Sequence, residues 1–405
     1  MVKQRCIMPD VPQKHMGIAV DASVSAETPE PPTEMVVAAA NARSFEKKAA
    51  DLVCTGTNDE AVINEAIARL TYGGTLRLAD GDYFIDAFSN EGNSAIFFGY
   101  NEGLTRVVTV KGTTEGKIYG TYRGASLHVT KRAMDAMAPD GVYRVFFGAG
   151  RIPEGPGDTY AYTHVNNVNF TNFRILFHDA SKPLIGIDGR HFGSMELDLV
   201  GVYTERYFPD RYEHLKPATP AKGSIGVYSL PGSNDESARN RYNKVCVGGL
   251  HTGFVFDEVD HLVMTGCMAA RCVYGYWFER GSPKTTTMIN CCDEGNAHLP
   301  HFRGRGHLTA IDFNVERFNA AFIPDDPDGD EEPAATEEQP GGWSGFLSYT
   351  LQGTAYGLGT GNWNPARFWR EGDGLNIRTF DFNAATHLGG EAHGHIGVAM
   401  SSQRV

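Results

Sequence analysis

The sequence lacks the features that would place a protein in a membrane or on a nucleic acid. No apolar run approaches the roughly 18 residues of a membrane-spanning helix. The opening stretch, MVKQRCIMPDVPQKHMG, has no apolar core of the kind that a secretory signal carries. Lysine and arginine number 36 against 49 acidic residues, for a net charge of -13, which disfavours nucleic acid as a partner. We expect a cytoplasmic or virion-associated protein that does not enter a membrane.

Paired cysteines are lacking as well. The chain has seven cysteines, an odd number, and their spacing shows no disulfide framework. Four of them fall where strands and turns are expected: Cys267, Cys272, Cys291 and Cys292. We therefore expect buried free thiols, which favours a cytoplasmic protein or a virion part over conventional secretion.

Metal-ligand spacing is also absent. The histidines of HLPHFRGRGH (298–307) match no zinc pattern. The acidic run from Asp325 to Glu331 offers oxygen ligands but lacks the full 12-residue calcium loop. We expect no cofactor, with calcium retained only for the case that the protein is a lyase.

The clearest pattern that is present runs from Ala50 to Asp86. Thr57 or Asn58 can cap a helix whose first turn is acidic. Apolar residues then recur along one helical face, at Val62, Ile63, Ala66, Ile67 and Leu70. Gly73-Gly74 ends the helix, and strand-forming residues follow on both sides of a turn at Gly81-Asp82.

This layout resembles the entrance to the right-handed parallel β-helix of the pectin-lyase-like superfamily. Proteins of that superfamily often open with D-G-x-x-D-x-x-A-I-x-x-A-I, followed by G-G-x-V-x-L-P-x-G-x-Y. The residues that match are Gly56, Asn58, Asp59, Ala61, Ile63, Ala66 and Ile67, followed by Gly73, Gly74, Leu76, Leu78, Gly81 and Tyr83. The resemblance implies that the helix caps the open end of a solenoid and that the glycine pair starts its first coil.

No catalytic residue can be carried over from the resemblance. The N-T-D, D-D, G-H-G and R-I-K elements of the polygalacturonase-like hydrolases do not occur intact. The W-x-D-H and R-x-P-x-x-R signatures of the classical pectate lyases are absent too. The resemblance therefore concerns fold rather than chemistry.

A degenerate repeat supports a solenoid. Six strand-like segments can be stacked, at 167–173, 194–200, 243–249, 261–267, 286–292 and 308–314. Most are 18 to 27 residues apart, and the one long step, of 49, is expected to hold two coils and an inserted loop. A second strand follows a glycine in several repeats, which gives two strands per coil. A β-sandwich is the alternative, but the Asn-Gly hairpin turns that it would use are scarce in this region.

The sequence thus predicts an all-β, right-handed parallel β-helix with an N-terminal capping helix. Acidic and proline-rich stretches suggest its limits. The expected regions are an arm with an edge strand at 1–49, the β-helix at 50–323 with an inserted loop at 204–222, an acidic loop at 324–341, and further coils or a C-terminal cap at 342–405.

Outward carboxylates are the candidates for catalysis. Alternate side chains of a strand point to opposite faces, so an inward Met195, Leu197 and Leu199 would leave Glu196 and Asp198 outward. The resemblance implies that such residues line a polysaccharide groove, whereas ordinary solvated acids are the alternative. The catalytic candidates are Glu196, Asp198, Asp293, Glu294 and Asp312.

Substrate-binding residues are expected in two loops. The inserted loop mixes aromatic, acidic and basic side chains, as sugar sites do, although it could equally form the interface of a homotrimer. Its candidates are Glu205, Arg206, Tyr207, Asp210 and His214. Arg303 and Arg305 are expected to hold a substrate carboxylate, because guanidinium groups bind carboxylates bidentately.

Three functions follow from these residues. The first is a carbohydrate-active enzyme, a glycoside hydrolase or transglycosylase, that cleaves an oligo- or polysaccharide with paired carboxylates. The second is a polysaccharide lyase acting on a uronate polymer, in which a basic side chain removes the proton next to the carboxylate, often with calcium. The third is a non-catalytic, glycan-binding phage tail or surface solenoid that assembles as a trimer.

Overall fold

The computed structural model divides the chain into two compact units, Met1–Glu30 and Pro31–Val405. Only Glu30 of the first unit is described, so everything below concerns the second. The described residues are 30–99, 106–114, 124–148, 166–178, 181–204, 220–229, 240–256, 261–278, 285–294, 296, 301–302, 306–317, 346–357, 375–377, 381–386 and 390–395.

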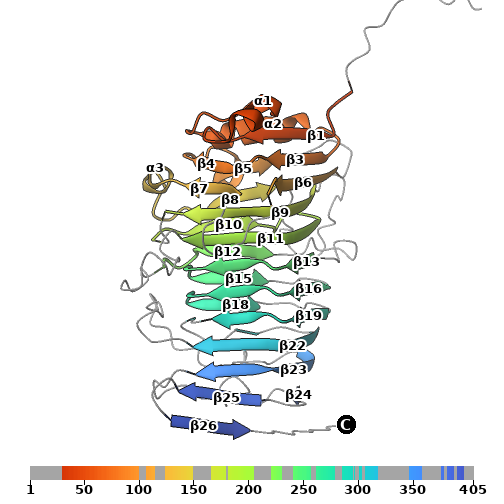
Figure 1. The fold of residues 1–405 in the computed structure, drawn as a ribbon, viewed down its shortest axis with the longest axis vertical. Coiled ribbons are helices and arrows are strands. Elements are labelled where there is room, and N and C mark those ends of the chain that lie inside the picture. The colour runs from red at the N-terminus through yellow and green to blue at the C-terminus, as the bar shows by residue number, and fades with distance from the viewer. Residues whose placement is uncertain are drawn as a thin grey trace, which may run out of the picture. The chain divides into compact units, whose positions relative to one another are not determined.

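The described chain is mostly β, with few helices, and its strands pair largely in parallel. One large sheet, sheet A, and a second sheet, sheet B, contain these strands. In Figure 1 they lie one beneath another in chain order, from β1 (Glu34–Ala38) to the antiparallel hairpin of β25 (Asp381–Thr386) and β26 (Gly390–His395). The prediction of an all-β fold built from parallel strands is thereby confirmed at this level.

The pairings arrange most of the strands in three columns, two in sheet A and one in sheet B. Column 1 contains β1, β3 (Gly74–Leu78), β6 (Arg106–Gly112), the first halves of β9 (Asn166–Phe177) and β11 (Ser194–Thr204), β13 (Asn240–Asn243), β16 (Leu262–Thr265), β19 (Thr285–Ile289) and the first half of β22 (Gly306–Arg317). Column 2 contains β4 (Gly81–Ile85), β7 (Ala125–Val129), the second halves of β9 and β11, β14 (Cys246–Gly248), β17 (Met268–Ala270), β20 (Cys292–Glu294) and the second half of β22.

Column 3 is sheet B. It contains β5 (Ser94–Phe98), β8 (Tyr143–Gly148), β10 (Leu184–Asp188), β12 (Ile225–Ser229), β15 (Thr252–Phe256), β18 (Tyr274–Phe278) and β21 (His301–Phe302). The remaining elements are α1 (Ser44–Ala49), β2 (Leu52–Val53), α2 (Asp59–Arg69), η1 (Glu91–Asn93), α3 (Lys131–Asp135), β23 (Phe346–Gly357) and β24 (Leu375–Ile377). The chain thus passes through three strand positions per repeat, where the sequence predicted two.

A left-handed turn separates columns 1 and 2 and explains the extra strand. Asn172, Leu199, Lys244, Gly266 and Asn290 all have φ between 51° and 60° and fall at one level of neighbouring strands. Such a turn reverses the inside–outside alternation, so the prediction that Leu199 faces inward is wrong. Leu199 is half-buried against a small apolar cluster apart from the main core.

The predicted helix forms as α2, but its N-terminus is held differently from the expectation. Ile63, Ala66 and Ile67 are buried, in agreement with the apolar pattern. Asn58, however, makes no side-chain cap. The first-turn acid Asp59 accepts hydrogen bonds from the Gly56 N–H at 3.0 Å and the Phe84 N–H at 2.9 Å instead, and so ties the helix to β4.

The described cysteines are all free, and most are buried. Cys267, Cys272 and Cys291 lie in the core, whereas Cys292 is half-buried on the outer face of column 2. Burial raises the pKa of the Cys272 thiol to about 12. The prediction of buried free thiols is therefore confirmed for three of its four cysteines.

Four glycines stack at one level of sheet B: Gly186, Gly226, Gly253 and Gly275. A Cβ atom on Gly253 would lie 2.6 Å from the Gly275 carbonyl oxygen and 2.7 Å from Cγ2 of Val247. A Cβ on Gly226 would meet the Gly253 oxygen at 2.6 Å. These contacts are closer than any side chain tolerates, so successive strands can approach here only because the residues are glycine.

Replacing Gly253 with alanine is expected to lower the free energy of unfolding by about 1–3 kcal/mol, because the new methyl group must push apart two packed strands. Gly99→Ala is the matched control, since its nearest neighbour, Cε1 of Phe97, would lie 3.8 Å away. Its effect should stay within about 0.5 kcal/mol. Urea unfolding followed by circular dichroism measures both, and equal effects would contradict this close stacking.

Candidate functional site

Two of the predicted carboxylates lie together on the outer face of column 1. Glu196 is exposed and Asp198 is half-buried. Leu197, which lies between them, and Met195, which precedes Glu196, are both buried. Glu196 and Asp198, here called the β11 pair, are two residues apart on one parallel strand, so their Cα atoms are separated by roughly 6.6 Å. This Cα spacing is of the same order as the roughly 5 to 9.5 Å that separates the two carboxyl groups of glycosidases.

Polar side chains surround the β11 pair on the neighbouring strands. Glu196 lies opposite Asn169 of β9 and Arg241 of β13. Asp198 lies opposite Asn243, whose Nδ2 donates a hydrogen bond to Asp198 Oδ1 at 2.7 Å. This hydrogen bond orients the carboxylate of Asp198, whereas the side chain of Glu196 is exposed to solvent.

The outward side chains of column 1 change in chemical type with distance from β11. Toward the N-terminus, Lys111 and Arg77 occupy the level of Asp198 on β6 and β3, and Arg77 forms an ion pair with Glu34 of β1 at 2.8 Å. Toward the C-terminus the face becomes apolar, because Val263, Ile289 and Ile311 are 36–39 % exposed. The polar middle, with its hydrogen-bonding side chains, is centred on β9, β11 and β13.

Asp293 does not belong to this face. Its side chain is fully buried in the core, where Asn296 Nδ2 donates to its carboxylate. The left-handed turn at Asn290 resets the alternation, so that Cys292 and Glu294 are half-buried on the outer side of column 2 and Asp293 points inward. The expectation that Asp293 takes part in catalysis at the surface is wrong for this reason, and Glu294 lies on a different column from the β11 pair.

The other predicted site residues lie outside what the structure describes. Asp312 is in β22, but its side chain is among those not described. The remaining ones are Glu205, Arg206, Tyr207, Asp210, His214, Arg303 and Arg305. Among the predicted residues that the structure describes, Glu196 and Asp198 are the two that it brings together.

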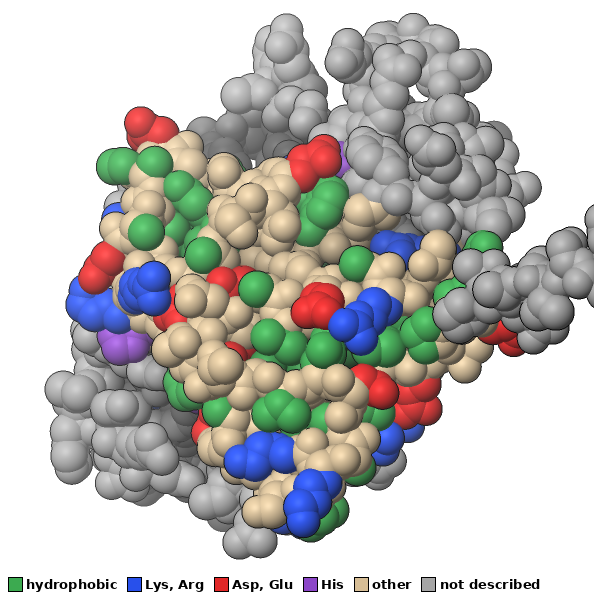
Figure 2. Space-filling model, turned by 90° about the horizontal axis from the view of Figure 1, so that it is seen from above, with side chains coloured by type: hydrophobic (Ala, Val, Ile, Leu, Met, Phe, Trp, Pro, Cys, Tyr) green, Lys and Arg blue, Asp and Glu red, His purple; other side chains and the backbone are tan. Residues whose placement is uncertain are grey.

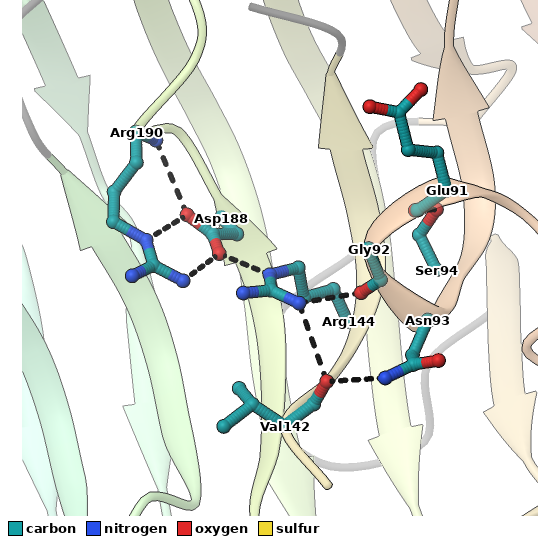
Figure 3. A network of polar contacts seen from close by, with 8 residues as sticks. All are labelled: Glu91, Gly92, Asn93, Ser94, Val142, Arg144, Asp188 and Arg190. Carbon is teal, nitrogen blue, oxygen red and sulfur yellow. Dashed lines mark hydrogen bonds and ion pairs between the residues drawn. The ribbon is translucent and has the colours of Figure 1, made fainter. Parts of the chain in front are cut away.

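A charged cluster that sequence reasoning missed lies on sheet B (Figure 3). The buried carboxylate of Asp188 accepts a hydrogen bond from Arg144 Nε at 2.6 Å and further bonds from Arg190 Nε at 2.8 Å and Nη2 at 2.5 Å. Arg144 also donates to the carbonyl oxygens of Gly92 and Val142, at 2.5 and 3.2 Å. The Asp188 carboxylate thus joins β8 to β10, and the Arg144 guanidinium extends the link to the turn before β5.

Aromatic rings cover both guanidinium groups of this cluster. The Arg144 guanidinium lies 4.6 Å from the Phe147 ring centre, and that of Arg190 lies 4.5 Å from the Tyr228 ring centre. The Asp188 side chain is 0 % exposed, and the two arginines are only 15 % and 18 % exposed. This burial identifies the Asp188 cluster as a structural tie between strands rather than a surface open to a ligand.

We expect low pH to weaken the ion pairs that Asp188 makes with Arg144 and Arg190. Burial raises the pKa of Asp188, but the hydrogen bonds and charges of Arg190 and Arg144 outweigh burial and hold that pKa below its ordinary value. The carboxylate therefore contributes stability that is present above about pH 4, where an unfolded aspartate titrates, and is lost as the pH falls through the lower folded-state value. As the pH is lowered through this range, the urea midpoint of unfolding should fall more steeply for the wild type than for Asp188→Asn. An equal fall for the two proteins would contradict a lowered pKa of Asp188.

The described surface around α1 and α2 has no dominant charge. In the view that looks onto α1 and α2, acidic and basic side chains are interspersed among hydrophobic ones on the described surface (Figure 2). Within the described part of the chain, no three His, Cys, Asp or Glu side chains are grouped as metal ligands would be. In the same part, no helix has the length and apolar character needed to cross a membrane.

Comparison with known proteins adds no family. No protein-family model, no curated protein and no solved structure matches this chain. The resemblance to the pectin-lyase-like superfamily therefore stays a prediction.

Proposed function

We propose that this chain is a closed, right-handed parallel β-helix that binds a polysaccharide along the outer face of column 1 and cleaves its glycosidic bonds. The order of the strands supports the fold. Column 1, column 2 and column 3 follow one another in β13–β14–β15, again in β16–β17–β18, and again in β19–β20–β21. A chain that returns to the same three positions at regular intervals grows by adding coils.

The observation that supports cleavage is the β11 pair among side chains that can bind hydroxyl groups. Asp198, whose orientation is fixed by Asn243, is assigned the role of base or nucleophile. Glu196, which is exposed, is assigned the role of the acid that protonates the leaving oxygen. The neighbouring amide, hydroxyl and guanidinium groups on β9 and β13 would orient the sugar rings.

The first experiment is to incubate the protein with neutral and uronate-containing polysaccharides and to determine the products. Shortened chains with new reducing ends support hydrolysis, and cyclic or rearranged products support transglycosylation. A rise in absorbance near about 235 nm, from unsaturated uronates, would instead support a lyase with Arg241 or another basic side chain as base. Addition of calcium or of a chelator then tests whether the lyase needs that ion.

A second candidate function is glycan binding without cleavage by a homotrimer. Two observations favour it: burial of Asp293 leaves the assembled carboxylates on a single strand, and Val263, Ile289 and Ile311 expose apolar surface on the same column. Retention of the protein on a polysaccharide that it does not shorten, together with a trimer mass by light scattering, would support this candidate over the enzyme.

A further inference from the structure

A second group of side chains suited to sugars lies on the outer face of column 2, near the capped end. Asp82 of β4, Ser126 of β7 and Arg174 of β9 lie at one level of three neighbouring strands. Phe84 and His128 lie side by side at the next outward level. These five residues are here called the Asp82 patch.

All five lie on the outer side of the strands, because the residues that alternate with them are in the core, although Ser126 itself is covered and only 1 % exposed. Tyr83 and Ile85 of β4 are at most 1 % exposed, as are Leu127 of β7 and Ile175 of β9. The Asp82 side chain is 41 % exposed and that of His128 is 20 % exposed. A ligand approaching from solvent can therefore reach the carboxylate.

The Asp82 carboxylate is held in place from both sides. His128 Nε2 lies 3.0 Å from Oδ1, and Asn41 Nδ2 donates to Oδ2 at 2.8 Å. The hydrogen bond from His128 lowers the pKa of Asp82 against a smaller opposing effect of burial, and the charges of His128 and Arg174 lower it further. The group is thus a fixed anion that keeps lone pairs for further donors.

An aromatic surface and a second polar group flank this anion. The rings of Phe84 and His128 are stacked, with centres 5.4 Å apart and an angle of 29° between their planes. Arg174 Nε donates to Ser126 Oγ at 2.9 Å, and Arg174 lies at the level of Asp82, two strands away. A stacked ring pair next to a carboxylate and a guanidinium offers one apolar face and groups that both accept and donate hydrogen bonds.

We infer that the Asp82 patch binds one sugar residue of a polysaccharide. The apolar face of the sugar ring packs on Phe84 and His128, two of its hydroxyls donate to the carboxylate, and Arg174 donates to a ring or hydroxyl oxygen. This inference rests on the proposed function, because it makes the patch a distant subsite of the same glycan.

The path between the β11 pair and the Asp82 patch is short. Arg174 is three residues beyond Thr171 on β9, and Thr171 lies opposite Asp198 on β11. The left-handed turn at Asn172 is all that separates the two outer faces at this strand. A chain of several sugars can thus extend from the β11 pair across the turn to the patch, whereas a short oligosaccharide reaches only one of them.

The test measures polysaccharide binding in a variant whose cleavage is strongly slowed. Asp82→Asn and Phe84→Ala are made in the Asp198→Asn variant, and affinity gel electrophoresis is run with homogalacturonan, alginate and xylan. We expect each change to weaken retention on the bound polysaccharide by about tenfold or more, since each removes a contact that involves a charged acceptor or a ring. Asp135→Asn is the matched control, because its carboxylate also has a side-chain partner, Lys131, and is 61 % exposed.

Each outcome decides the inference. The inference is supported if both variants are retained more weakly while the control variant and the thermal unfolding midpoints are unchanged. Partial recovery of retention with Asp82→Glu supports the role of the carboxylate. Retention equal to that of the parent, or no retention of the parent on any of the three polysaccharides, overturns it. Cleavage by the protein with its native Asp198 is scored separately, so a binding protein that does not cut refutes the proposed enzyme while leaving the patch intact.

Discussion

Replacing Asp198 with asparagine is expected to slow polysaccharide cleavage by about 100- to 10,000-fold, which is the range that a positioned general base contributes. Asparagine keeps the size of the side chain, and its oxygen can still accept the hydrogen bond that Asn243 Nδ2 makes at 2.7 Å. The fold and the affinity for the polysaccharide should therefore change little. The measurement is the initial rate of new reducing ends, with binding determined separately.

Glu196→Gln should cause a loss of the same order, but with a different pH profile. If Glu196 donates a proton, its removal abolishes the limb of the profile on which the rate falls as the pH rises. Arg241→Lys is a useful comparison, because it keeps the charge opposite Glu196 and should alter binding more than the rate of the chemical step. Rates within threefold of the wild type for both carboxylate variants would exclude the β11 pair as the catalytic groups.

Replacing Asp188 with asparagine is expected to lower the free energy of unfolding by about 3–5 kcal/mol, because two largely buried guanidinium groups would lose their counter-charge. Arg144 and Arg190 are held between Asp188 and aromatic rings, so neither can turn to solvent without leaving its ring. The size of the effect follows from burial, since exposed pairs contribute about 1 kcal/mol or less.

Asp135→Asn again supplies the control for Asp188→Asn. Lys131 Nζ lies 2.6 Å from the Asp135 carboxylate, but both side chains are more than 60 % exposed. Its loss should cost less than about 1 kcal/mol in the same urea titration. A similar cost for the two substitutions would show that the Asp188 cluster is not a buried tie.

The sequence pattern predicts the fold best where the alternation of side chains is unbroken. Met195 and Leu197 enter the core and Glu196 and Asp198 face outward, because β11 is regular up to that point. One residue later the pattern fails, since Leu199 takes a φ of 53° that neither its side chain nor its neighbours in sequence signal. Asn290, with a φ of 52°, has the same effect on Asp293.

The Asp188 cluster could not be predicted for a different reason. Arg144 and Asp188 are 44 residues apart, and they meet only because β8 and β10 are neighbours in a register that pairs Arg144 with Ile185. A sequence pattern describes faces of single strands but not which strands are adjacent. The Asp82 patch was missed on the same ground, because its residues come from three strands, and Asn41, which binds the Asp82 carboxylate, comes from a separate loop.

Polysaccharide chain length, followed by size-exclusion chromatography during incubation with the protein, tests cleavage by the β11 pair most directly. We expect the wild type to shorten at least one neutral or uronate-containing polysaccharide, and the Glu196→Gln/Asp198→Asn double variant to bind that polysaccharide without shortening it. An unchanged chain length with the wild type on every polysaccharide, or equal shortening by the double variant, would contradict the proposed function.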